Sequence, residues 1–185
     1  MEKPVHEENY KGLTIKIYAD DNGGSPKDWG DDGLFLVADH RDFSVNGPKK
    51  EKPSACIEIY GKTHHVFGLE AYIHSGVVLA LSREGNFPDR QWDVSQLGAV
   101  FVSKKEFRLK KSARKCAQGL IETWNDYLSG NVYGYNVETE EGSAVDSVWG
   151  FYGDYDKEGG ALLEARSAAN YHVKNNPTPF IGAGI

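Results

Sequence analysis

The fold of this 185-residue chain is decided by residues 113–128, whose sequence is ARKCAQGLIETWNDYL. Side chains three or four positions apart lie on one face of an α-helix, so an apolar stripe with this spacing predicts an amphipathic helix. Gly130 follows, at a position where the left-handed residue that ends many helices is expected. The stripe consists of Ala113, Ala117, Leu120, Ile121, Trp124 and Leu128.

The segments around this helix have the patterns of β-strands. Short runs of apolar, β-branched and aromatic residues alternate with turn residues, as expected for strands joined by tight connections. Residues 162–173 predict a second, weaker helix near the C-terminus. The order of elements predicts an α+β fold, with a mainly antiparallel sheet, one long amphipathic helix and a weaker C-terminal helix. The predicted strands are residues 13–18, 34–38, 55–60, 69–73, 77–81, 99–102, 132–137 and 145–152.

Length and composition favour one globular domain. Hydrophobic residues make up 39% of the chain and charged residues 26%, which are values typical of a folded domain. The loop at residues 46–53 is too short to indicate a domain boundary. We therefore predict a polar leader over residues 1–11, a single α+β domain over residues 12–173 and an extended tail over residues 174–185.

Charge, cysteine content and hydropathy exclude several classes of protein. The net charge of −6 is too small for a mimic of DNA, which needs a dense array of carboxylates. Cys56 and Cys116 lack the spacing of a zinc site, so two free thiols are expected. No apolar run approaches the ~18 residues of a membrane span, and the N-terminus lacks the features of a signal peptide. These observations predict a cytoplasmic protein with no membrane partner.

The sequence offers weak evidence for catalysis. The acidic loop is a poor match to a calcium-binding loop, because Gly24 and Ser25 stand where a ligand and the turn glycine are required. His64 and His65 are adjacent and would point to opposite faces of a strand. We therefore expect no cofactor, no metal and no catalytic residue, while a metal-dependent enzyme using this loop with His40 or His74 remains an alternative. The loop carboxylates are Asp20, Asp21, Asp28, Asp31 and Asp32.

A basic segment over residues 104–115 is the stronger candidate site. Seven of its twelve residues are basic and one is acidic. Ser103 and Glu106 have the spacing of a capping box, which predicts a helical turn at the start of the segment. Its cations could neutralise the phosphates of a nucleic acid, or they could form a solvated face. The candidate binding residues are Lys104, Lys105, Arg108, Lys110, Lys111, Arg114 and Lys115.

Two aromatic blocks add further candidates. Trp92, with Asp93 and Gln96 as polar neighbours, could contribute to a binding surface. Strand alternation would place Trp149 and Phe151 on one face of a sheet, and the large area of these side chains favours a place in the core.

Five motifs lie in order along the chain, at residues 25–30, 72–76, 92–104, 127–134 and 146–153, and the two most distinctive read WDVSQLG and DSVWGFYG. By these motifs the chain resembles small uncharacterised proteins of bacteriophages and mobile elements. The resemblance covers residues 13–153 and implies an accessory protein that acts by binding a host protein or ribonucleoprotein complex. Such a protein would inhibit a host defence complex, as in CRISPR or restriction systems, inside the host cytoplasm. A nucleic-acid-binding accessory protein is the alternative.

Overall fold

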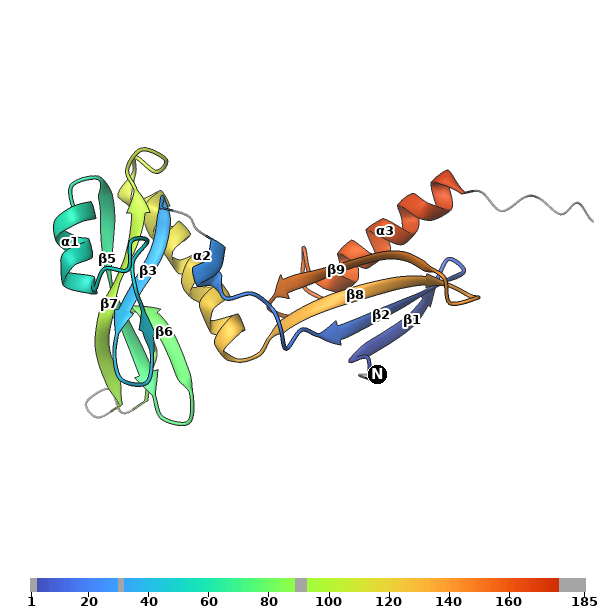
Figure 1. Ribbon diagram of the computed structural model, residues 1–185, viewed down its shortest axis with the longest axis horizontal. Coiled ribbons are helices and arrows are strands. Elements are labelled where there is room, and N and C mark those ends of the chain that lie inside the picture. The colour runs from blue at the N-terminus through green and yellow to red at the C-terminus, as the bar shows by residue number, and fades with distance from the viewer. Residues whose placement is uncertain (1–2, 30–31, 89–92, 177–185) are drawn as a thin grey trace, which may run out of the picture. The chain divides into compact units, whose positions relative to one another are not determined.

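The computed structural model describes residues 3–29, 32–88 and 93–176, and it divides into two compact units (Figure 1). One unit comprises residues 1–23 and 130–185, and the other comprises residues 24–129. Each unit has its own antiparallel sheet and its own helical cover, so the predicted α+β class is confirmed. The prediction of a single domain over residues 12–173 is wrong, because the apolar side chains gather in separate cores around the two sheets.

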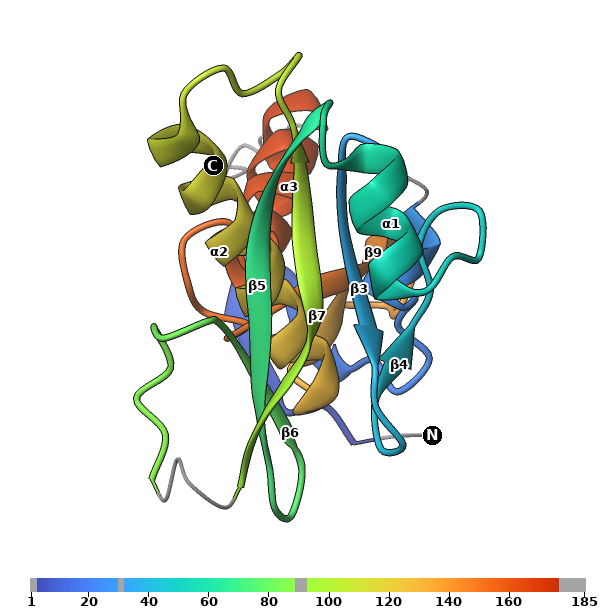
Figure 2. The ribbon, with the colours of Figure 1, turned by 90° about the vertical axis from the view of Figure 1, so that its left-hand side faces the viewer.

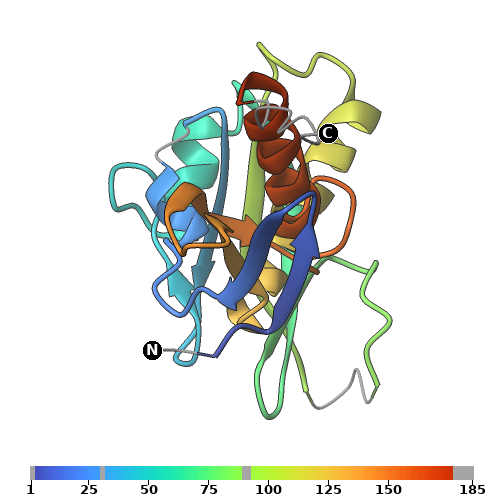
Figure 3. The ribbon, with the colours of Figure 1, turned by 90° about the vertical axis from the view of Figure 1, so that its right-hand side faces the viewer.

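The terminal unit contains a four-stranded sheet in the order β1-β2-β8-β9, and α3 covers one of its faces (Figures 1 and 3). Alternation along β2 buries Ile15 and Ile17 completely, and Ala165 and Ala169 of α3 complete this core. The elements are β1 (His6–Tyr10), β2 (Leu13–Ala19), β8 (Val132–Thr139), β9 (Ala144–Tyr152) and α3 (Ala161–Asn175).

The predicted polar leader contains strand β1. Its residues pair in register with β2 from His6 to Tyr10. Lys11 and Gly12 connect the two strands with φ angles of 53° and 79°, which are typical of a two-residue hairpin turn. The polar side chains of β1 concealed the strand, because β1 is an edge strand that buries little surface. At the other end, α3 reaches Asn175, and residues 177–185 of the predicted tail lie outside the described residues.

An ion pair between β1 and α3 makes the stability of this unit depend on pH. Arg166 donates to both carboxylate oxygens of Glu8, at 2.8 and 2.7 Å. This guanidinium holds the pKa of Glu8 below its ordinary value of 4.5. Because ionised Glu8 is bound more favourably in the folded chain, the ion pair stabilises the fold above pH 4.5. This contribution is lost as the pH falls through the pKa of Glu8 in the folded protein.

Arg166→Gln is therefore expected to destabilise the terminal unit by about 1 kcal/mol at pH 7, since both side chains are partly exposed. Urea denaturation of the variant and the wild type, followed at pH 7 and at pH 3, would measure the difference. The difference should shrink at pH 3, where Glu8 is protonated in the unfolded chain. An equal difference at the two pH values would contradict this assignment.

The central unit contains a five-stranded sheet in the order β4-β3-β7-β5-β6, with α2 on one face and α1 on the other (Figure 2). The long helix α2 confirms the predicted stripe, since five of its six apolar residues are buried and Leu128 is partly buried. Gly130 has the predicted positive φ, at 76°. The elements are η1 (Pro26–Trp29), β3 (Leu34–Asp39), β4 (Ser44–Val45), α1 (Pro53–Tyr60), β5 (His64–Ile73), β6 (Val77–Leu81), β7 (Val94–Ser103) and α2 (Lys110–Leu128).

Residues 55–60 form helix α1, so the strand predicted there is wrong. Pro53 occupies the first turn of the helix, a position where its fixed φ and missing N–H favour a helical start. Cys56 is fully buried against Val37 and Phe101, while Ile57 and Ile59 are half exposed. The alternating apolar residues therefore do not reflect a buried strand face. Burial also raises the pKa of the Cys56 thiol, and both cysteines are free thiols as predicted.

Within the described ranges, no helix is both long enough and apolar enough to cross a membrane.

Candidate nucleic-acid interface

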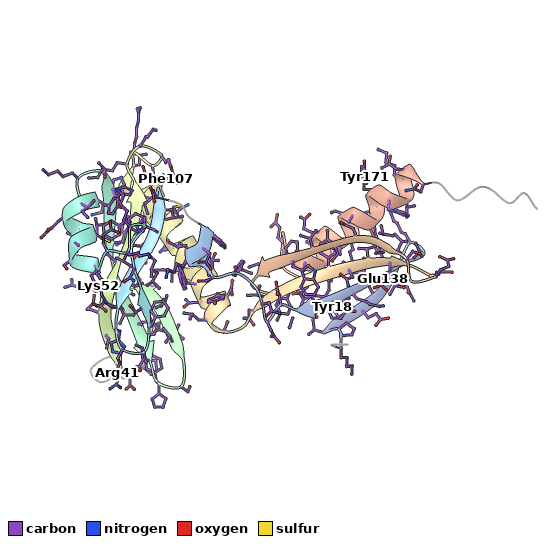
Figure 4. The ribbon with its side chains drawn as sticks, in the orientation of Figure 1. Tyr18, Arg41, Lys52, Phe107, Glu138 and Tyr171 are labelled. Carbon is purple, nitrogen blue, oxygen red and sulfur yellow. The ribbon has the colours of Figure 1, made fainter. Side chains whose placement is uncertain are left out.

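The basic segment forms the turn between β7 and α2 together with the first turns of α2, and we call residues 104–115 the basic corner. Figure 4 labels Phe107 in the middle of this turn. The Oγ of Ser103 accepts a hydrogen bond from Lys105 N–H, and its carbonyl accepts one from Phe107 N–H. Glu106 does not complete the predicted capping box, because the Ser103 N–H already donates to Gly33 O within the sheet. The predicted turn forms. Ser103 Oγ caps it, but the return bond from Ser103 N–H to the Glu106 side chain is missing.

Contacts to neighbouring strands fix the main chain of the basic corner. The Lys104 N–H donates to Thr63 O at 3.0 Å. His65 Nε2 lies 2.8 Å from Phe107 O on the far side of the turn. These contacts hold the main chain in one arrangement, so the cations of the corner project from a fixed base.

Two of the seven predicted cations have partners inside the unit. Lys104 Nζ donates to the carbonyl of Lys62 at 3.0 Å. Arg114 pairs with Glu84 at 3.1 Å, and its guanidinium lies 5.9 Å from the centre of the Phe67 ring. These two side chains contribute to the fold of the corner.

The other five cations are exposed and form no ion pair with any carboxylate in the described part of the chain. They come from the turn and from the solvent-facing side of α2, opposite its buried stripe. The structure therefore brings together five of the seven predicted residues as a free positive surface. They are Lys105, Arg108, Lys110, Lys111 and Lys115.

The start of α2 is electrostatically unfavourable for the isolated protein. Lys110 and Lys111 occupy the first two helical positions, where the positive end of the helix dipole disfavours cations. Each also lies four residues before another cation, Arg114 or Lys115, and such like-charge pairs are destabilising. Leu109, at the N-cap, provides no side-chain cap and is 71% exposed. The clustered cations and the missing side-chain cap both cost stability, and both favour an anion at this end of the helix.

The remaining predicted binding residues do not join this surface. Trp92 lies outside the described residues. Asp93 lies 3.9 Å from His74 Nδ1, at the start of β7. Gln96 donates to Glu70 and accepts from Ser82 Oγ at 2.8 Å, so its amide belongs to an internal network.

Glu70 is a buried carboxylate that was not among the site residues predicted from the sequence. It is completely buried, and its carboxylate accepts hydrogen bonds from the main-chain N–H groups of Arg83 and Gly85. These bonds anchor the loop that follows β6. The one feature of the sequence that could have indicated this role is a glutamate inside an apolar strand. A carboxylate buried in this way needs several hydrogen-bond donors around it. Its contacts indicate a structural role.

The prediction that Trp149 and Phe151 share a core face is wrong. Gly150 has a φ of 86°, and the register shifts so that Trp149 pairs with Gly134 while Phe151 pairs with Tyr133. This bulge breaks the alternation and turns the two rings to opposite faces. Phe151 packs in the core under α3, whereas Trp149 is 47% exposed on the face away from α3.

Trp149 and Tyr18 form an aromatic pair on this face, which we call the open face of the four-stranded sheet. Their rings lie 6.1 Å apart in a stacked arrangement. The absence of a side chain on Gly134 makes room for the indole, which would clash with a Cβ there. The Trp149 Nε1–H donates to Ser147 Oγ at 3.1 Å. Tyr18 and Glu138 of this sheet are labelled in Figure 4.

The residues considered for catalysis have structural contacts. Asp39 pairs with Lys52 at 2.6 Å, while His40 Nδ1 accepts from Asp42 N–H and lies 3.6 Å from the Asp42 carboxylate. His64 is buried between Thr63 Oγ1 and Asp32 O. The described residues contain no group of three or more His, Cys, Asp or Glu side chains placed to hold a metal ion, and Asp31 lies outside them.

Comparison with protein-family models, curated proteins and solved structures finds no match for this chain.

Proposed function

We propose that this protein acts by binding, and that its basic corner binds the phosphate backbone of a nucleic acid, either free or within a host ribonucleoprotein complex. The observation that carries the proposal is the gathering of five unpaired cations at a helix end where they lower the stability of the protein itself. A phosphate backbone would neutralise these charges and gain from the helix dipole.

The composition of the corner favours contacts to the backbone over contacts to bases. Lysine and arginine side chains bind phosphates without reading sequence. The exposed apolar residue of the corner is Leu109, and its aromatic residue, Phe107, packs against the core of the central unit. The corner therefore lacks an exposed ring on which bases could stack. We expect binding with strong dependence on salt and little preference for sequence.

A second candidate function is recognition of a protein partner through the open face of the four-stranded sheet. Large exposed aromatic side chains are enriched where proteins bind one another. Trp149 is held in place by Tyr18 and Ser147, so it would be ordered before any partner binds. The phage-type resemblance makes a host defence complex in the cytoplasm the proposed partner. The target of this second surface would be a protein surface, not a phosphate backbone.

A capture experiment would separate the two functions. Tagged protein is incubated with bacterial lysate, with and without nuclease, and the captured molecules are identified. The first function predicts capture of nucleic acid, loss of associated proteins after nuclease treatment, and loss of both in a variant with Lys105, Arg108, Lys110 and Lys111 changed to Glu. Capture that survives nuclease and is lost in Trp149→Ala would instead support the second function and contradict the first.

A further inference from the structure

We infer that the central unit contains a pocket for a small planar nitrogen heterocycle, of the size and hydrogen-bonding character of a nucleoside. The cavity has a volume of about 440 Å³, within the range typical of small-molecule sites. Its walls are mainly apolar, with a few polar groups. The residues that matter for recognition are Trp29, Leu34, Leu36, Asn46, Leu120 and Trp124, and we call this cavity the edge pocket.

The edge pocket exists because strand β4 is very short. It pairs with Ala38 and Asp39 of β3 and then ends at Val45, so the edge of β3 before Ala38 has no strand beside it. By the register of β3 and β4, Gly47 is the residue that would continue the ladder opposite Leu36. The chain turns away there, with Gly47 N–H donating to Glu51 O.

The unpaired edge of β3 borders the pocket. Ser103 N–H donates to Gly33 O, which fixes the alternation of hydrogen bonds between β3 and β7. By that alternation, the N–H and C=O of Phe35 face β7, and those of Leu36 face the opposite edge. Within the described residues no backbone hydrogen bond reaches Leu36 from that side. Leu36, which is 3% exposed, therefore has one donor and one acceptor without a strand partner at the border of the pocket.

Asn46 supplies a second polar feature. Its Oδ1 is buried and has no hydrogen-bond partner within the described protein. A buried acceptor without a partner is unfavourable, and a ligand that donates an N–H would remove that penalty. Burial of this acceptor beside the edge of β3 favours a ligand with an N–H donor next to an acceptor, as in a nucleobase or an aromatic amide.

The apolar walls favour a flat ligand. Trp124 and Leu120 of α2 form part of the wall, and Trp29 of the short helix η1 is 54% exposed where it borders the cavity. The exposed ring of Trp29 provides stacking area for a planar ligand, whereas Trp124 is 4% exposed. Lys27 and Lys50 border the cavity together with Asp32, so an anionic substituent on the ligand would be tolerated. The motif at residues 25–30 therefore supplies residues of this pocket.

Titration of ¹⁵N-labelled full-length protein with adenosine and with uridine tests the pocket directly. We expect shifts concentrated at the side-chain amide of Asn46, the main-chain N–H of Leu36 and the indoles of Trp29 and Trp124. A third titration, with a short oligoadenylate, distinguishes a free nucleoside from a base within a strand. No shift at these signals with any of the three probes would overturn the inference.

Asn46→Leu tests the role of the unpaired acceptor. We expect at least a tenfold loss of affinity for the probe that binds, together with an equal or higher Tm, because the change removes an unsatisfied buried atom. Asn125→Leu is the matched control: the Asn125 amide bonds both main-chain groups of Leu79, so its loss should lower the Tm. Unchanged probe affinity in Asn46→Leu, or a fall in Tm like that of Asn125→Leu, would overturn the assignment of Asn46.

Discussion

Changing Lys105, Arg108, Lys110 and Lys111 to Glu is expected to lower the affinity for nucleic acid by at least about 100-fold, since four phosphate contacts become repulsive. The same variant should unfold at an equal or higher temperature. Glu at each of the first two positions of α2 interacts favourably with the helix dipole and should stabilise the helix by roughly 0.3–1 kcal/mol. It also places opposite charges four residues before Arg114 and Lys115. Fluorescence anisotropy with a labelled oligonucleotide and thermal unfolding would measure the two effects.

This combination of lost binding and retained stability separates a binding surface from a structural one. A control with the same change in net charge reverses four exposed cations that are not part of residues 104–115, and it should keep most of the affinity. If the corner variant binds as tightly as the wild type, the basic corner is a solvated face and the proposal is wrong. The control residues are Arg41, Lys49, Lys157 and Lys174.

Trp124→Ala is expected to destabilise the central unit by about 3–5 kcal/mol, as is usual when a large buried aromatic side chain is removed. Trp124 is 4% exposed and packs edge-on against Phe43, with ring centres 5.6 Å apart. Chemical denaturation followed by amide signals of the five-stranded sheet would measure the loss.

Trp149→Ala provides the comparison for this core substitution. It removes the same side chain from an exposed position of the other unit, so a loss of about 1 kcal/mol or less is expected. Equal effects of the two substitutions would show that Trp124 does not carry the core of the central unit.

The long elements of the fold were predictable because their periodicity reflects burial. The stripe of α2 and the alternation of β2 both face cores within their own units, and both follow directly from the sequence. Residues 55–60 were misassigned, because Cys56 is the buried residue of α1 and two exposed isoleucines imitate strand alternation. The division into two units was not predictable, because it depends on which strands pair across more than a hundred residues.

The candidate site was predictable only as a segment. The density of lysine and arginine identified residues 104–115 as a candidate site. Lys104 and Arg114, however, contact Lys62 and Glu84, which are distant in the sequence, and so contribute to the fold and not to the free positive surface. Trp149 was misplaced, since a single bulge at Gly150 reverses the face on which it lies. The edge pocket depends on where β4 ends and on residues from η1, β3 and α2 meeting in space, which no local pattern indicates.

The most direct test of the central claim is the dependence of nucleic-acid affinity on salt concentration. Each phosphate contact to a single strand contributes about −0.7 to the slope of log K against log salt concentration. Five contacts therefore predict a slope of about −3.5 for the wild type. A slope near zero for the wild type, or no binding at low salt, would contradict the assignment of the basic corner as a phosphate-binding surface.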